Sequence, residues 1–374
     1  MSPRKFVKKL KSWIQWYEGN EKIRRGIIYP KFPLHVSDGL FAVITPIFTL
    51  RYLKLNIEAF CCLFVAEHVV QLVTHVECVR WLNALGFKDL QRRSVLILLA
   101  SAGLLLTIPF FPEPWILANP WPIFLIYAAA RLLFALGLNA FDTNVSAAVH
   151  NAAFFPPAEA VTASEFLYAT QFLGFLAGSM LARLAFAVAS IQWSLLVPAL
   201  LVADMHLAVE AIADGTFPPD PATPAPATPR PAAPRGEAAA GPPLPGQRPI
   251  WDNPIWAHPE SRWLLAQFLV ALLLFNALHI SFPFLLPLLG MRLGFDDEDV
   301  ALLVALPPAA GLLLFWLGSA FADENYVVRG AVAGAGLAAG YWCAAAATTF
   351  FDLFVAAFVF AVAACYSCNL VAQR

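Results

Sequence analysis

Long apolar stretches separated by short polar segments dominate the chain. A helix needs about 20 mostly apolar residues to cross the hydrocarbon core of a bilayer. The stretches are too long for barrel strands and show no two-residue alternation, which leaves helices as the only plausible spanning element. Ten spans are predicted, at residues 37–53, 56–82, 92–111, 121–150, 160–186, 190–212, 261–291, 298–320, 326–349 and 351–370. The pattern therefore predicts an all-α integral membrane protein, a helical bundle of about ten transmembrane helices.

Two other segments differ in composition from the apolar runs. Residues 214–258 are rich in Pro and Ala, and such a segment cannot bury enough apolar area to fold, so we expect an extended linker. The linker separates a six-span half, residues 35–213, from a four-span half, residues 259–374. Residues 1–34 precede the first half and hold nine Lys or Arg.

The basic tail has an amphipathic pattern, because five apolar residues recur at helical spacing opposite several lysines. Such a helix suits the surface of an anionic lipid leaflet, and a solvated tail that only sets the topology is an equally good interpretation. Lys and Arg accumulate on cytoplasmic loops, so we expect the N-terminus and the linker in the cytoplasm and, by default, a cell-membrane location. Arg51 and Lys54, between the first two spans, depart from this rule. The apolar residues of the tail are Phe6, Leu10, Trp13, Ile14 and Tyr17.

Composition and charge exclude several classes of function. Charged residues make up 13% of the chain, half of the about 25% that is typical of a soluble domain, so much of the surface must face lipid. A formal net charge of −1 argues against nucleic acid as a partner. The six cysteines are scattered, and we interpret them as packing residues. The sequence contains no metal-binding His cluster, nucleotide-binding loop or hydrolase motif, so we expect no cofactor, no metal site and no enzymatic activity.

The fourth span carries the most informative polar residues. Arg131, Asn139, Asp142 and Ser146 fall within an arc of about 80° on the helix. An arginine midway along a membrane helix costs roughly 2.5 kcal/mol or more, so Arg131 requires water or a polar partner. Asp142 lies about three turns away, too far for a direct pair, so each charge must find its partner elsewhere. We interpret Arg131 and Asp142 as coupling or gating residues and Asn139 as a solute contact. The alternative is a structural network of ion pairs with other helices.

A second polar stripe lies on one face of the second span, with Glu67 at its edge. Its members are His68, Gln71 and His75. Histidine titrates near neutral pH and can relay protons, so these side chains are candidates for solute or proton handling; hydrogen-bonded packing is the alternative, and a metal site is the least favoured. Asn276 and His279, near the centre of the seventh span, are candidate solute contacts from the second half, again with packing as the alternative.

Two further patterns concern helix ends and helix contacts. The acidic run 296–299 opens the eighth span, where acidic side chains ordinarily cap a helix; cation binding is the less favoured interpretation. Three patterns have the spacing that allows close approach of two helix backbones: Gly174-x-x-x-Gly178, Gly330-x-x-x-Gly334 and Gly336-x-x-x-Gly340.

The layout resembles the major facilitator superfamily of secondary transporters, in which a central linker joins two six-helix halves. Arg131 and Gly137 match the family's R-x-x-x-G-x-G pattern in the fourth span, with Ala135 in place of the first glycine. Residues 85–93 resemble the family's G-x-x-x-D-R-x-G-R-R loop after the second span. There the basic pair fits, Gln91 stands where a glycine is expected, and the acid is displaced.

Residues 318–323 are similar to a second copy of this loop in the second half. The resemblance implies alternating access around a cavity lined by both halves, with Asp89, Arg92 and Arg93 latching the conformations. It implies a secondary transporter of a small polar or organic solute, with protons as a candidate coupling ion. The family norm is twelve spans, so the last two would be missing, through truncation or because a partner protein completes the bundle. The alternative is a non-transporting membrane scaffold or assembly factor on a degenerate transporter fold.

Overall fold

The computed structural model describes residues 28–150, 157–210, 281–318 and 326–372, together with scattered residues between 11 and 19. These residues are helical apart from short turns, and no strand occurs among them. All of them except Ser281 and Phe282 belong to one compact unit, Met1–Asp220 with Pro283–Arg374. The predicted linker, residues 214–258, lies outside the described residues.

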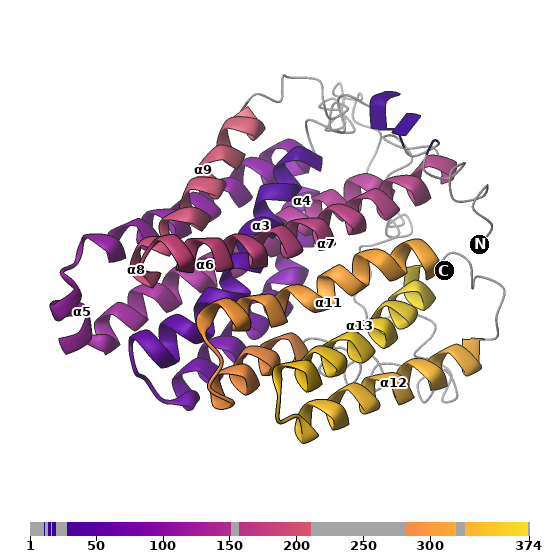
Figure 1. Ribbon diagram of the computed structural model, residues 1–374. Helices are drawn as coiled ribbons and strands as arrows, with labels where there is room; N and C mark the ends of the chain where they lie inside the picture. The colour runs from indigo at the N-terminus through magenta and orange to yellow at the C-terminus, as the bar shows by residue number, and fades with distance from the viewer. Residues whose placement is uncertain are drawn as a thin grey trace, which may run out of the picture. The chain divides into compact units, whose positions relative to one another are not determined.

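Long helices account for most of the described part of the chain (Figure 1). They are α3 (Tyr29–Pro46), α4 (Ile57–Thr107), α6 (Pro120–His150), α7 (Pro157–Val188), α9 (Leu196–Glu210), α11 (Asp297–Gly318), α12 (Tyr326–Ala346) and α13 (Phe350–Ala372). Shorter elements are the π-helix η2 (Ile47–Tyr52), the 3-10 helix η3 (Ile108–Phe110), α5 (Glu113–Ala118) and α8 (Ile191–Ser194). Residues 281–292, at the end of the predicted seventh span, are helical as well.

Helix α4 contains both the second and the third predicted span. Its 51 residues would extend about 75 Å at 1.5 Å per residue, more than twice the roughly 30 Å of a hydrocarbon core. Gly86, with φ 78° and ψ 175°, interrupts the helical backbone between the two spans. Asn144 of α6 donates a hydrogen bond of 3.0 Å to the carbonyl of Phe87, so the carbonyl next to the kink is paired.

Helix α3 begins at Tyr29, eight residues before the predicted start of the first span at residue 37. Pro30 occupies its first turn, where the missing N–H of proline has no intrahelical partner to lose. Lys31 and His35 lie in this extension, and both are buried. The polar residues that made this segment look like part of the tail therefore belong to the interior of the six-span half.

Three glycines bring α3 and α7 into close backbone contact. A methyl group on Gly178 would collide with the carbonyl of Val36, and one on Gly39 would collide with the backbone of α7. A methyl group on Gly174 would lie 2.8 Å from the Cβ of His35, closer than real side chains approach. The predicted role of Gly174-x-x-x-Gly178 in helix contact agrees with this packing.

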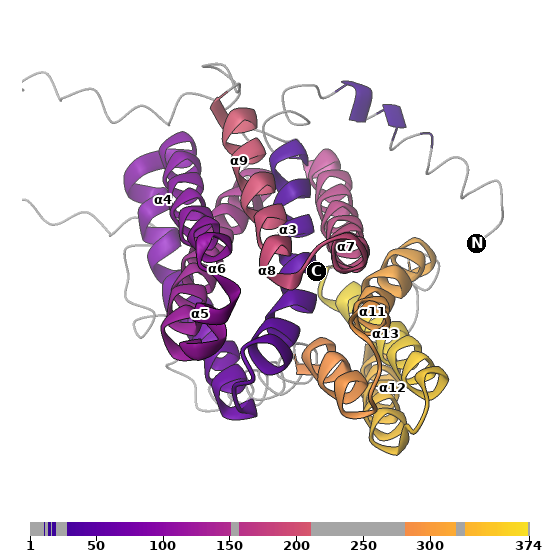
Figure 2. The ribbon, with the colours of Figure 1, turned by 60° about the vertical axis from the view of Figure 1, so that its left-hand side comes forward.

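Helices α3 and α6 instead meet through large side chains. In the view of Figure 2, α3 lies between α7 and the α4–α6 pair. The rings of Phe41 and Phe134 pack edge to face with centroids 4.8 Å apart. One turn further along α3, the hydroxyls of Thr45 and Tyr127 are 2.7 Å apart and form a buried hydrogen bond. The space between the tight α3–α7 pair and the α4–α6 pair is thus filled by aromatic rings and polar groups, and this is where the charged residues lie.

The helices after the linker show a similar use of glycine. Helix α12 packs along α13, and α11 contacts both α13 and α7. A methyl group on Gly336 would lie 2.6 Å from the Cβ of Ala363, and one on Gly340 would lie 2.8 Å from the Cβ of Phe360. Both glycines of the Gly336-x-x-x-Gly340 pattern therefore lie in a close helix contact, as predicted. Among the described residues, a methyl group on Gly334 would meet open space, so the predicted close contact is wrong at that glycine.

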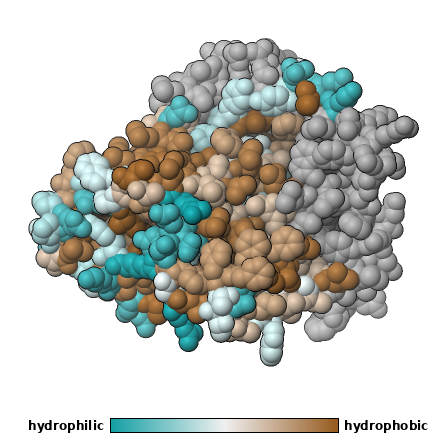
Figure 3. Space-filling view, viewed as in Figure 1, coloured by the Kyte–Doolittle hydropathy of each residue, from teal (hydrophilic) through white to brown (hydrophobic). Residues whose placement is uncertain are grey.

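Apolar side chains cover much of the visible surface, drawn brown in Figure 3. On α4, seven of them are more than half exposed: Ile57, Val65, Val69, Leu72, Val73, Val76 and Leu96. Among the described residues, four helical stretches are long and apolar enough to cross a membrane, namely Tyr29–Tyr52, Ile57–Phe110, Pro120–Val149 and Thr162–Val188. An apolar exterior over helices of this length is that of a protein embedded in a membrane.

Candidate functional site

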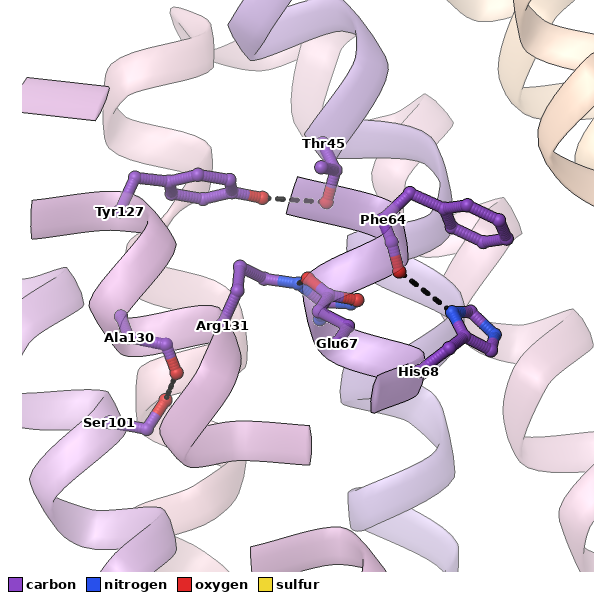
Figure 4. A network of polar contacts seen from close by, with 8 residues as sticks. All are labelled: Thr45, Phe64, Glu67, His68, Ser101, Tyr127, Ala130 and Arg131. Carbon is purple, nitrogen blue, oxygen red and sulfur yellow. Dashed lines mark hydrogen bonds and ion pairs between the residues drawn. The ribbon is translucent and has the colours of Figure 1, made fainter. Parts of the chain in front are cut away.

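The centre of the site is a buried ion pair between α6 and α4 (Figure 4). The Nε and Nη2 atoms of Arg131 donate to the two carboxylate oxygens of Glu67, each at 2.7 Å. The two side chains are only 5% and 6% exposed. This two-bond arrangement matches the planar guanidinium to the planar carboxylate and is the strongest geometry for such a pair.

Aromatic and neutral polar groups surround this pair. The Arg131 guanidinium lies over the Phe41 ring, 4.3 Å from its centroid, in a cation–π contact between α6 and α3. Its third nitrogen, Nη1, has no hydrogen-bond partner among the described residues. Arg131 therefore holds one carboxylate on α4 and keeps one donor without a partner inside the six-span half.

A second charged cluster joins α6 to the beginning of α3. The Lys31 ammonium lies 2.9 Å from the Asp142 carboxylate, and the His35 ring lies 3.7 Å from the same oxygen. Lys31 and His35 are 7% and 1% exposed, whereas Asp142 is 31% exposed. Neither ring nitrogen of His35 has a hydrogen-bond partner among the described residues. The expectation that Arg131 and Asp142 find separate partners agrees with this geometry.

Asp38 is coupled electrostatically to both clusters. It follows His35 by three residues on α3, and its carboxyl group interacts electrostatically with His35, Arg131, Glu67 and Asp142. Lys31, His35 and Asp38 were not predicted as site residues. Their spacing of four and then three residues places them on one helix face. The predicted boundaries divide this face, because they assign Lys31 to the tail and Asp38 to the first span.

A small polar pocket of about 120 Å³ opens beside the Lys31–Asp142 pair. It lies where α3 begins, α6 ends and α7 begins. Its lining residues are Lys31, Asp142, Ser146, Val149, Ser164, Leu167, Tyr168 and Gln171. Its volume is smaller than the about 300–1,000 Å³ of typical small-molecule sites, so it has room only for a small polar group. Among the described residues, no group of three or more His, Cys, Asp or Glu side chains is arranged to hold a metal ion.

The predicted polar stripe of the second span lies mainly along the contact of α4 with α6. Asn139 donates hydrogen bonds of 2.9 Å to the backbone carbonyl of Gln71 and to the hydroxyl of Thr74. The His75 ring is 3.5 Å from the hydroxyl of Thr143. These contacts hold the two helices in register, and Gln71 takes part through its backbone.

His68 is placed by the structure, whereas the two candidate residues of the seventh span are not described. The Nδ1 atom of His68 pairs at 2.8 Å with the carbonyl of Phe64 on its own helix, as Figure 4 shows. His68 therefore belongs to the helix carrying Glu67 but makes no hydrogen bond to Arg131. Asn276 and His279 lie outside the described residues.

The predicted latch residues lie just after the kink in α4. Asp89, Arg92 and Arg93 are exposed, and none forms an ion pair with another described residue, whereas the intervening Gln91 is buried. The Oε1 atom of Gln91 accepts a hydrogen bond of 2.6 Å from Asn144 of α6. The residue that replaces the expected glycine thus fastens this segment to α6.

Known protein families were compared with the sequence, and one family matches it. No curated protein matches the sequence. The model of the Major Facilitator Superfamily matches residues 39–373, from the first span to the end of α13 and across the linker. Members of this family are multi-pass membrane proteins that act as secondary transporters, which is consistent with the buried charges and apolar exterior. The resemblance to this family is therefore confirmed, and the chain belongs to the Major Facilitator Superfamily.

Proposed function

We propose that this transporter moves a small polar or organic solute by alternating access and couples the movement to protons. One observation carries the proposal: charged pairs join α6 to two different helices. Arg131 forms a buried pair with Glu67 on α4, and Asp142 forms a partly buried pair with Lys31 on α3. Both carboxylates are groups that a proton can neutralise, and each neutralisation would release a cation.

Stability alone is a poor reason to keep these charges. Removing two charges from water costs several kcal/mol per ion, and a well-packed apolar pair is often as stable as a buried ion pair. Ionisable side chains inside a membrane protein therefore usually mark solute or ion pathways. A role in the transport cycle gives the Arg131–Glu67 pair a reason to exist.

Asp38 supplies a second partner for Arg131. When Glu67 takes up a proton, its attraction for the guanidinium falls, and the Asp38 carboxylate on α3 interacts with the same guanidinium. Transfer of Arg131 from α4 towards α3 would change how the tight α3–α7 and α4–α6 pairs attract each other. Proton binding would in this way be linked to a movement of helices.

The pocket beside Asp142 is the proposed place where a solute meets the six-span half. Its charged and polar groups comprise an ammonium, a carboxylate, hydroxyls and an amide, which suit a small polar solute of mixed hydrogen-bonding character. With the N-terminus in the cytoplasm, as the basic tail suggests, this pocket would open to the cytoplasmic side. His68, His75, Asn139, Asn276 and His279 remain proposed contacts, and Asp89, Arg92 and Arg93 a proposed cytoplasmic latch.

The test uses purified protein in liposomes that enclose a pH-sensitive dye. Amino acids, carboxylic acids and sugars are added in turn, and solute-dependent proton entry is recorded. We expect at least one class to drive protons inward in the wild type, and Glu67→Gln to abolish that signal. The control is Glu77→Gln, which changes an exposed acid of the same helix. Solute uptake without proton movement, or full coupling in Glu67→Gln, would overturn the proposal.

A further inference from the structure

Arg51 connects the six-span half to the segment that precedes α11. It stands at the end of η2, and its Nη1 atom forms an ion pair with the carboxylate of Asp297. Its Nη2 atom donates to the backbone carbonyl of Phe295. One guanidinium therefore holds both the turn before α11 and the first residue of that helix.

A second arginine approaches the same helix turn from α7. The Nε atom of Arg183 lies 3.7 Å from the carboxylate of Glu298. Within the acidic run, Asp296 accepts a hydrogen bond of 2.8 Å from the backbone N–H of Asp299 and so caps α11, as predicted for acids at this position. Asp297 and Glu298 do something different, because they face arginines from the other half of the chain.

Apolar side chains close the space next to these charges. Phe295 packs against the core of the six-span half, and Val300 and Val304 of α11 are buried in that core. At the same interface, the ring of Phe64 on α4 lies 4.1 Å, centroid to centroid, from the ring of Phe284. Charged pairs and an apolar layer thus join the two halves where η2 and α7 end, whereas the polar pocket lies where α3 and α7 begin.

We propose that Arg51 and Arg183, with Asp297 and Glu298, form a gate that holds the outer side of the transport path closed. The inference rests on the proposed alternating access and on the N-terminus being cytoplasmic, which places the end of η2 at the outer face. It also gives Arg51 a reason to stand in an outer loop against the usual bias of positive charge.

The exposure of these pairs suits a gate. The side chains are between 32% and 46% exposed, and exposed ion pairs stabilise a structure only weakly. A contact that must break in every cycle has to be weak, because a strongly bound state would trap the transporter. The hydrogen bond from Arg51 to the Phe295 carbonyl fixes the orientation of the guanidinium and uses a neutral acceptor in place of another carboxylate.

The test measures access from the outside to a reporter beneath the gate. Thr49→Cys places a thiol at a fully buried position two residues before Arg51, in a chain whose six native cysteines are replaced by serine. A membrane-impermeant maleimide is added to intact cells, without solute. We expect slow labelling with the native gate, a several-fold faster rate in Arg51→Glu or Asp297→Arg, and a return to slow labelling when both changes are combined.

The matched control is Arg80→Glu, which disrupts an exposed arginine–glutamate pair within α4 and should leave labelling slow. Equal rates in all variants would overturn the gate, and so would fast labelling in the combined charge swap, because the two residues would then not act as partners. The assay needs neither solute nor a proton gradient. A failure of proton coupling would therefore leave its result intact, and a failure of the gate would leave the coupling proposal intact.

Discussion

Two arginine–carboxylate pairs of this transporter differ mainly in their burial. Arg131 and Glu67 are 5% and 6% exposed, inside the six-span half. Arg51 and Asp297 are 32% and 37% exposed and join that half to α11. The chemistry of the groups is the same, but water screens the second pair and hardly reaches the first.

The difference in burial determines what each pair can do. A buried pair is costly to break by removing one partner, because the other charge is left without compensation. In the proposed cycle, protonation of Glu67 therefore weakens its attraction for Arg131 and changes how strongly α4 and α6 are held together. A half-exposed pair is easily broken and remade, so it suits a contact that opens and closes.

The largest expected effect comes from breaking the buried pair on one side. Glu67→Ala leaves the Arg131 guanidinium uncompensated, and we expect a loss of about 3–5 kcal/mol in the free energy of unfolding. The change is measured as a fall in the melting temperature of the detergent-solubilised protein. A melting temperature equal to that of the wild type would show that the Arg131–Glu67 pair is hydrated and does not differ from the Arg51–Asp297 pair in this respect.

The Lys31–Asp142 pair should lie between the two extremes. Lys31→Met leaves a carboxylate that is 31% exposed and partly hydrated, so we expect a loss of about 1–3 kcal/mol. The same melting assay applies, with the exposed Arg92→Met as control, for which we expect a change within about 0.5 kcal/mol. A loss as large as that of Glu67→Ala would mean that the exposure of a pair does not determine how much free energy of unfolding is lost when it is broken.

The smallest effect on stability is expected for the outer pair. Arg51→Ala should cost at most about 1 kcal/mol, and raising the ionic strength should speed the labelling of Thr49→Cys because salt screens exposed charges. Coupling through Arg131 should be insensitive to the same salt. If salt left the labelling unchanged, the apolar layer alone would hold the outer side closed.

The helices could be predicted from the sequence because long apolar runs allow almost no other structure in lipid. The arginine of the fourth span could be singled out for the same reason, since its burial is so costly. Its partner could not be named: Glu67 stood at the edge of a polar stripe, and only the register of α4 against α6 shows that it faces Arg131.

The start of the first helix and the outer contact were harder to predict. Lys31 falls in the predicted basic tail and His35 lies just before the first predicted span, whereas α3 begins at Tyr29 and both side chains are buried. The acidic run before α11 has the composition of an ordinary helix cap. A contact between residues 51 and 297 joins distant parts of the chain, and no local pattern carries that information.

The most direct test of the central claim replaces the whole buried pair. Arg131→Met combined with Glu67→Met removes both charges while filling their space, so the fold should be retained. Solute-driven proton entry is then measured in liposomes. We predict a protein that melts within a few degrees of the wild type and moves no protons with its solute. Proton entry at the wild-type rate would show that the pair serves the fold alone and would contradict the account.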